Sequence, residues 1–386
     1  MVAELKIRLV DTTLRDGEQA VGVIFTRWEK KQIATLLAEI GVPAIEAGYP
    51  PLGPEEQECV MAIAEAGLRV NGGVQPLEVN AFARARRDDV VAVAACGADA
   101  VVISISTSDM HIERKFRRSR QWVLEQIQEA ADEARSLGLV FCVSAEDASR
   151  TDLAFLIQYY QLAEELGART VRYCDSLGVE DPYTTYRRVK VLTQEIGLPV
   201  EMHMHNDFGM ATANALAGVR AGARSVVSSI GGLGERTGNA PLEEVVMALT
   251  HLYGVSLDID TSRFREIAEY VAGASQRAIP IWKAIIGTNV FAHESGIHAD
   301  GILKNPSSYE AFSPEEVGLE RQIVIGKHSG SNALVHKFRT EFGIELDGET
   351  ANLLLERVRS TAVELKRPLF TKELMFLYEE SWQGGA

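Results

Sequence analysis

Two histidines alternate with methionines in one short stretch of the sequence, residues 201–207 (EMHMHND). Side chains of a strand point to opposite faces in turn, so Glu201, His203 and His205 would share one face. Two histidines on one strand face can bind one metal ion, and an added carboxylate gives a set suited to Zn, Mn or Fe(II), with Mg possible. The alternative is a hydrogen-bonded histidine pair in a polar core. The following Asn206 and Asp207 favour the metal site.

A second group of chemical residues lies near the start of the chain, at residues 11–19 (DTTLRDGEQ). Here Arg15 and Asp16 directly follow an apolar stretch, which is also common in a solvated turn. If the first and last strands are neighbours, Asp16 and Arg15 could reach a metal bound by the two histidines. A metal beside a guanidinium would bind an anionic oxo substrate and stabilise developing charge.

Two further segments add candidates. The glycine-rich stretch 232–239 (GLGERTGN) contains Asn239, the one side chain there that could ligate a metal. Near the C-terminus, residues 291–312 concentrate polar groups that include His298 and Tyr309. An exposed polar loop is one interpretation. The other is that His298 serves as the mobile proton acceptor, because histidine titrates in the right range.

A repeating pattern predicts the elements that would position these residues. An amphipathic stretch, a glycine and a β-branched run recur through the first 250 residues. A glycine just past a helix adopts the left-handed conformation at low cost, so each joint is typical of a helix end that leads into a strand. The joints are Gly41, Gly67, Gly97, Gly138, Gly167, Gly197 and Gly222.

With the opening strand, these joints make eight βα units, which predicts an α/β fold of the (β/α)8 TIM-barrel type over residues 1–256. A doubly wound open sheet is the alternative, but no GxGxxG motif follows the first strand. Residues 257–386 are expected to form a mostly helical C-terminal extension, with helices near 263–272 and 353–365. Because barrel chemistry lies at the carboxyl ends of strands, Ser144, Glu146 and Ser176 are further candidates.

The acidic composition of the chain argues against two classes of binding partner. The chain has 54 acidic against 39 basic side chains and a net charge of −15, so nucleic acid and membrane surfaces are not expected to bind it. The longest apolar region, residues 90–105, is interrupted by Asp99 and is too short to span a bilayer. Four widely spaced cysteines suggest a reduced, cytoplasmic protein without disulfides.

Taken together, four motifs resemble the metal-dependent acyl-CoA condensing barrels. This family includes homocitrate, 2-isopropylmalate and citramalate synthases, with hydroxymethylglutaryl-CoA lyase as a more distant member. The motifs are residues 11–19, 203–207 (HMHND), 232–239 and 296–301 (GIHADG), so the resemblance covers nearly the whole chain. It implies a Claisen-type condensation of acetyl-CoA with a 2-oxo acid, catalysed by a homodimer.

The resemblance also implies roles for single residues. A divalent metal ion (Mg, Mn or Zn) would be bound by Asp16, His203, His205 and, as a fourth possible ligand, Asn239. The implied catalytic residues are Arg15, which steadies the oxo group, Glu146, Tyr309 and His298, the acid/base group that the neighbouring subunit would deliver. Ser176 would line the substrate pocket.

The choice of 2-oxo acid depends on weaker signals. Residues 146–155 (EDASRTDLAF) and 327–330 (KHSG) resemble the homocitrate synthase of nitrogen-fixing bacteria, which implies 2-oxoglutarate. Lysine-pathway homocitrate synthases carry an arginine where this chain has Cys142, so the donors to a second carboxylate are expected to be His111, Ser144 and Ser176.

Residues 107–116 (TSDMHIERKF) instead resemble isopropylmalate synthases, but those usually carry a long regulatory domain after the extension, and this sequence ends at Ala386. We therefore expect a homocitrate synthase. The alternatives are 2-isopropylmalate synthase, citramalate synthase, and a non-catalytic sensor of metal or 2-oxo acid. A sensor would keep the histidine pair and would not need Arg15 or His298.

Overall fold

A computed structural model describes residues 6–383 of the chain. It divides into two compact units, one that runs to Ile279 and one that starts at Pro280. Each unit is described by itself.

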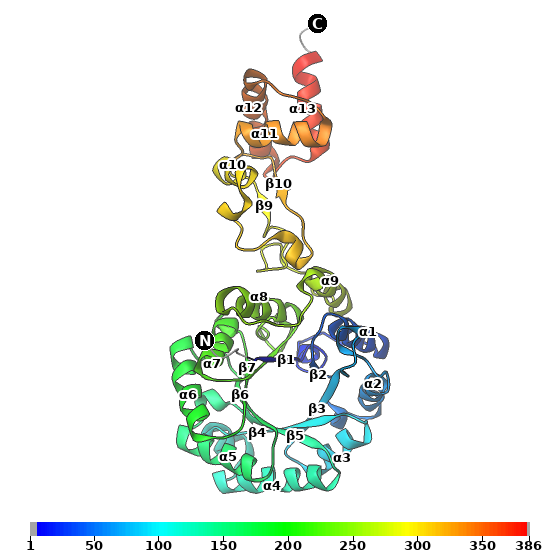
Figure 1. Ribbon diagram of the computed structural model, residues 1–386, viewed down its shortest axis with the longest axis vertical. Helices are drawn as coiled ribbons and strands as arrows, with labels where there is room; N and C mark the ends of the chain where they lie inside the picture. Colours follow the sequence, from blue (N-terminus) through cyan, green and yellow to red (C-terminus); the bar gives the residue numbers. More distant parts are fainter. Residues whose placement is uncertain (1–5, 384–386) are drawn as a thin grey trace. The chain divides into compact units, whose positions relative to one another are not determined.

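The first unit contains a closed barrel of eight parallel strands (Figure 1). Neighbours in sequence pair in order, and the last strand pairs with the first, with Arg8 opposite Ser225 and Asp11 opposite Ser228. The strands are β1 (Arg8–Asp11), β2 (Ala44–Glu46), β3 (Glu78–Arg84), β4 (Ala100–Ser106), β5 (Val140–Glu146), β6 (Thr170–Asp175), β7 (Val200–Met204) and β8 (Ser225–Ser228). The predicted TIM barrel is confirmed, and closure excludes the doubly wound sheet.

Helices surround the strand ring, one after each strand (Figure 1). They are α1 (Arg27–Glu39), α2 (Pro54–Ala64), α3 (Arg87–Ala95), α4 (Arg120–Ser136), α5 (Leu153–Glu165), α6 (Pro182–Glu195), α7 (Ala211–Ala221) and α8 (Leu242–Tyr253). Side-chain caps set several starts, because the first amides of a helix need acceptors. Thr26 and Glu29 form a capping box on α1, and Asp181 accepts from two amides of α6.

Six of the seven predicted glycine joints have positive φ angles, from 58° at Gly67 to 119° at Gly222. Gly197 is the exception, because α6 ends at Glu195 and the following Ile196 is extended. The strand expected directly after Gly67 was wrong. Asn71 and Gly72 adopt left-handed conformations in a short 3₁₀ turn (Val70–Gly72), and this turn delays β3 to Glu78.

The β7 strand follows the predicted alternation. Met202 and Met204 are fully buried, and a Cβ on Gly218 of α7 would lie only 2.5 Å from Met202 Sδ. Because the methionine face packs directly against the α7 backbone, the opposite face with Glu201 and His203 points into the barrel.

The barrel unit continues past residue 256, where the sequence predicted its end. Helix α9 (Phe264–Ser275) packs on α1, and Arg263 forms an ion pair of 3.0 Å with Glu39. Asp260 also donates its backbone N–H to the carbonyl of Ile40 at 2.8 Å. These contacts bind residues 260–275 to the barrel unit.

The second unit is mostly helical, as predicted. Its elements are β9 (Ala292–His293), α10 (Gly296–Lys304), β10 (Gln322–Ile323), α11 (Ser331–Lys337), α12 (Gly348–Leu365) and α13 (Thr371–Gln383), with β9 and β10 parallel. Phe338, Leu334 and Leu354 lie at the centre of its own hydrophobic core and are fully buried.

Short helical turns complete the described chain. In the first unit they are Gly17–Gln19, Pro50–Leu52, Val70–Gly72, Ala148–Arg150, Ile230–Gly232 and Thr261–Arg263, with a π-helical segment at His111–Phe116. In the second unit they are Pro306–Ser308, Pro314–Val317 and a π-helical segment at Phe338–Phe342. The turns that follow β1, β4, β5 and β8 lie at the carboxyl ends of strands, where a barrel places its chemistry.

Candidate active site

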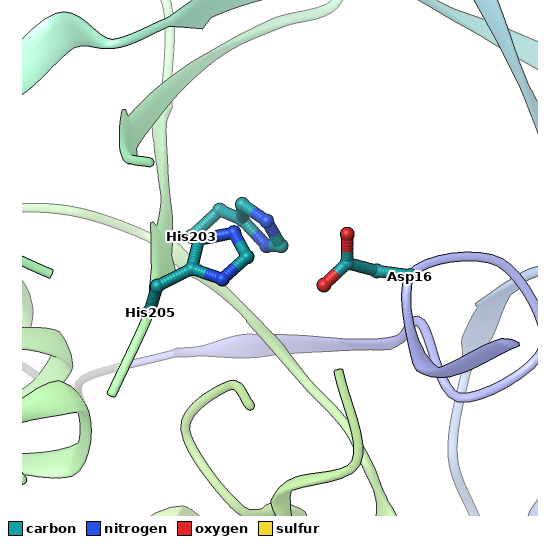
Figure 2. A group of neighbouring side chains, drawn as sticks. All are labelled: Asp16, His203 and His205. Atoms are coloured by element: carbon teal, nitrogen blue, oxygen red, sulfur yellow. The ribbon is translucent and has the colours of Figure 1, made fainter. Parts of the chain in front are cut away.

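Asp16, His203 and His205 come together at the carboxyl ends of β1 and β7. Their potential ligand atoms all lie within 4.8 Å of one another, and each side chain is 5% exposed or less. Figure 2 shows both imidazoles facing the Asp16 carboxylate across a small gap. The two rings lie 5.0 Å apart at 89°, so their nitrogens approach from different directions.

The chemistry of this group fits a divalent metal ion. The Nδ1 atoms of His203 and His205 are buried and find no hydrogen-bond partner among the residues that the structure describes. Burial holds the pKa of His203 well below its usual value and also lowers the pKa of His205, which keeps both rings in the neutral form that binds metals. Burial opposes ionisation of Asp16, but the Arg15 guanidinium and the hydrogen bond from Asn239 outweigh it and lower its pKa.

Asn239 lies beside this group. Its Nδ2 donates to Asp16 Oδ2 at 2.6 Å, and its buried Oδ1 has no hydrogen-bond partner among the described residues. A Cβ on Gly234 would come within 2.5 Å of Asn239 Nδ2 and 3.1 Å of Asp16 Oδ2. The glycine in the GLGERTGN motif therefore leaves the room in which Asn239 meets Asp16.

Arg15 is held in place by carboxylates on two sides. Its Nη1 donates to Asp16 Oδ1 at 2.9 Å and its Nε donates to Glu46 Oε2 at 2.7 Å. Glu46 also pairs with the buried Arg172, which in turn contacts Glu201 at 2.7 Å. Burial opposes ionisation of Glu46, but the two arginines more than offset it and hold its pKa well below the usual range. The charges of these ion-paired residues thus compensate one another inside the barrel.

A cavity of about 350 Å³ opens above these residues. Eight of the eleven predicted site residues line it: Arg15, Asp16, His111, Ser144, Glu146, Ser176, His203 and His205. On its wall, His111 Nδ1 lies 3.1 Å from Ser106 Oγ and 3.6 Å from Glu146 Oε1. Glu146 pairs with Lys115 at 2.9 Å.

The two predicted serines differ in availability. Ser144 is 2% exposed and its Oγ lies 3.3 Å from Cys174 Sγ, a weak partner that leaves the hydroxyl able to turn toward a ligand. Ser176 instead accepts a hydrogen bond from the Asp147 backbone N–H at 2.8 Å. Because Asp147 has a strained, left-handed φ of 63°, Ser176 also stabilises the turn after β5.

Several lining residues were missed by the sequence analysis. Phe82 projects from β3 and Ser104 from β4. Arg172 and Cys174 both project from β6. The Arg15 guanidinium stacks over the Phe82 ring at 4.7 Å. The misplaced third strand concealed Phe82, whereas the alternation of β4 and β6 could have identified Ser104 and Cys174.

His298 and Tyr309 belong to the second unit. Their rings lie 4.4 Å apart at 41°, and both side chains are exposed. A Cβ on Gly301 would lie 2.5 Å from the Tyr309 ring, so the GIHADG glycine permits the close approach of that ring to α10. The rings of His298 and Tyr309 therefore lie against each other, and their catalytic role stays a prediction.

Two known protein families match this chain. Residues 6–271 match the HMGL-like family, and residues 285–366 match the homocitrate synthase post-HMGL domain-like family. The chain belongs to the HMGL-like family of metal-dependent condensing enzymes. Enzymes of this family generally depend on a divalent metal ion, in agreement with the cluster of Asp16, His203 and His205.

The relatives of this HMGL-like protein differ in their named products. It is 57% identical over 374 residues to 2-isopropylmalate synthase 2 of Caldanaerobacter subterraneus subsp. tengcongensis, covering 97% of this chain and 95% of that protein. It is 48% identical over 375 residues to homocitrate synthase 1 of Nostoc sp., covering 97% of each. Chain length therefore does not separate the two activities.

Solved structures share the fold. The hydroxymethylglutaryl-CoA lyase of Pseudomonas aeruginosa superposes with a TM-score of 0.63 at 22% identity, covering 72% of this chain and 96% of that one.

Across the described residues, every helix is too short or too polar to cross a bilayer. All four cysteines are buried, and none forms a disulfide.

Proposed function

We propose that this protein is an acyltransferase that joins the acetyl group of acetyl-CoA to a 2-oxo acid. The observation that carries the proposal is the buried group of Asp16, His203 and His205 beside Arg15 in one strand-end cavity. A metal ligand set next to a guanidinium suits an α-oxo carboxylate, and the relatives named as synthases of such products support the assignment.

Asp16, His203 and His205 would hold the metal ion, with Asn239 beside them. When bound, the ion supplies Lewis-acid polarisation of the 2-oxo group. Arg15 then stabilises the negative charge that develops on the oxo oxygen, and Asp16 and Glu46 hold its guanidinium in a fixed orientation.

Proton transfer is needed at two atoms. A base removes a proton from the acetyl methyl group, the resulting carbon forms a bond to the 2-oxo carbon, and the oxo oxygen takes up a proton. Water then breaks the thioester C–S bond, which releases the CoA thiol and leaves a new carboxylate. We assign this proton transfer to His298, supported by Tyr309, from the partner subunit of a homodimer, and a role at the pocket wall to Glu146.

The cavity favours a 2-oxo acid with a neutral branched side chain, namely 2-oxoisovalerate. The three arginines that line it are each paired with a carboxylate: Arg15 with Asp16, Arg172 with Glu201 and Arg236 with Asp207. The remaining wall includes the Phe82 ring and Cys174, which suit apolar groups. The 57% identical relative supports the same product, 2-isopropylmalate.

2-Oxoglutarate, the substrate that the sequence favoured, is the second candidate. The hydroxyls of Ser104 and Ser144 and the imidazole of His111 line the cavity and could donate to a second carboxylate. The 48% identical homocitrate synthase supports it. A role of that product in nitrogen fixation stays a prediction.

The test is release of free thiol from acetyl-CoA with Mg or Mn and each of three acids: 2-oxoisovalerate, 2-oxoglutarate and pyruvate. We expect the highest kcat/KM with 2-oxoisovalerate. A higher value with 2-oxoglutarate would establish the homocitrate assignment instead, and pyruvate would indicate citramalate. If none of the three acids causes thiol release while metal and 2-oxo acid still bind, the protein is a sensor.

A further inference from the structure

A strongly basic segment stands out in this acidic chain. Residues 111–120 (HIERKFRRSR) hold one carboxylate, Glu113, whereas the whole chain has a net charge of −15. The cations are Arg114, Lys115, Arg117, Arg118 and Arg120. Such a local reversal of charge attracts anions that the rest of the surface repels.

This segment lies at the rim of the active-site cavity. It follows β4, and its first residue, His111, lines the cavity wall. Lys115 Nζ contacts Oε1 of Glu146, another lining residue, at 2.9 Å. A ligand that occupied the cavity could therefore extend directly onto the basic segment.

Three of the cations remain available. Arg120 is bound to Asp109 at 2.6 Å and Lys115 to Glu146. Arg114, Arg117 and Arg118 are exposed and form no ion pair with any carboxylate that the structure describes. Their charge is thus uncompensated.

Aromatic rings lie among these cations. Phe116 and Trp122 pack with ring centres 5.4 Å apart, and the Arg118 guanidinium lies 5.9 Å from the Trp122 ring. The Arg118 backbone N–H donates to the Ile112 carbonyl at 3.0 Å, which ties the loop back onto the π-helical turn. Both rings are half-buried. Aromatic rings beside arginines can stack a base while the arginines bind its phosphates.

We propose that Arg114, Arg117 and Arg118, with Trp122, bind the 3′-phospho-ADP end of acetyl-CoA. This inference rests on the proposed function. Its chemical basis is that CoA carries several phosphate charges and an adenine on a long arm, whose thioester must reach the cavity. His111 and Arg118 are seven residues apart, so even a fully extended chain would separate them by at most about 25 Å.

The test replaces all three arginines together, Arg114→Gln/Arg117→Gln/Arg118→Gln. Because hydrogen bonds to charged groups contribute more than neutral ones, we expect the KM for acetyl-CoA to rise roughly 10- to 100-fold. The KM for S-acetylpantetheine, which lacks the nucleotide, and the KM for the 2-oxo acid should not change. Raising the salt concentration should weaken acetyl-CoA binding to the wild type more than to the variant.

A matched control removes the same charge elsewhere. Arg135→Gln/Lys190→Gln/Arg220→Gln changes exposed residues in the later parts of α4, α6 and α7, which lead toward the amino ends of the strands. This control should leave the KM for acetyl-CoA unchanged. An equal rise in both variants would overturn the proposal, because net charge alone would then explain the effect.

Direct binding measurements test the nucleotide site independently of the proposed reaction. Calorimetry with coenzyme A and with adenosine 3′,5′-bisphosphate needs no turnover. We expect the arginine variant to bind both at least tenfold more weakly than the wild type and the control. Equal affinities would overturn the nucleotide site even in an active enzyme, whereas weaker binding in a chain that releases no thiol would overturn only the proposed reaction.

Discussion

The imidazole of His205 should be needed for metal binding and dispensable for folding. Its ring borders the cavity, and its buried Nδ1 finds no partner in the described part of the chain. His205→Ala should abolish thiol release and lower the bound metal measured by mass spectrometry, with little change in Tm. His251→Ala, at an exposed position of α8, is the control. Wild-type metal content in His205→Ala would remove this residue from the site.

Asp11 should make stability depend on pH. The carboxyl is fully buried, and burial, only partly offset by hydrogen bonds from Thr13, raises its pKa to about 7. Between its unfolded pKa near 3.8 and this folded value, the folded state holds a proton that the unfolded state has lost. The free energy of unfolding should therefore fall as the pH rises through this window.

Asp11→Asn removes this titration and keeps an acceptor for the Thr13 N–H. Urea unfolding from pH 5 to 8 should show the difference between wild type and variant shrinking or reversing as the pH rises, because other groups cancel in the comparison. A difference that is constant over this range would show that Asp11 does not retain its proton in the folded protein.

At the scale of elements, Lys30 of α1 connects two loops of the site. Its side chain is 1% exposed, and its Nζ contacts Glu18 at 2.5 Å and Glu56 at 2.7 Å. Each carboxylate also accepts from a backbone N–H, Glu18 from Phe25 and Glu56 from Tyr49. Glu18 belongs to the turn directly after Arg15 and Asp16, so this ion pair positions the loop that carries them.

Lys30→Met would leave two carboxylates without their shared cation. Breaking a buried pair in this way costs about 3–5 kcal/mol, whereas Arg27→Met, in the exposed pair with Glu58, should cost about 0–1 kcal/mol. Chemical denaturation measures both. Metal affinity should also fall in Lys30→Met and recover in Lys30→Arg. If both methionine variants lose the same small amount of stability, Lys30 does not connect the loops.

Element-scale patterns explain how much the sequence could predict. The alternation in EMHMHND placed His203 correctly, because a strand buried on both faces leaves little freedom of register. Closure of eight units then brought Asp16 beside it, since β8 pairs with β1. Phe82 was missed because the Val70–Gly72 turn, a local backbone feature, shifts β3 several residues along the chain.

For the enzyme as a whole, the sequence leaves the choice of acceptor acid open between 2-oxoglutarate and 2-oxoisovalerate. The neutral residues that we propose to select its side chain, Phe82 and Cys174, belong to no motif. The residues that we propose for the chemistry common to both substrates are charged residues at strand ends, and these residues do belong to motifs.

A homodimer in which His298 serves the partner's barrel makes a sharp prediction. His298→Ala and Asp16→Ala should each be inactive, with His298→Ala losing about 10²–10⁴-fold in kcat, the usual contribution of general acid–base catalysis. After subunit exchange, half of the dimers are mixed and carry one complete site, so activity should approach roughly a quarter of wild type. No recovery despite demonstrated exchange would place His298 outside the partner's site.

The reaction that we propose forms a carbon–carbon bond from acetyl-CoA in the cavity that Asp16, His203 and His205 border. The most direct measurement is ¹³C NMR of the products formed from acetyl-CoA labelled at the acetyl methyl carbon, with 2-oxoisovalerate and Mg or Mn. We expect the label to appear as the methylene carbon of 2-isopropylmalate, with one CoA thiol released per product and none without metal. Label that remains in acetyl-CoA, or appears only in free acetate, with every 2-oxo acid offered would contradict it.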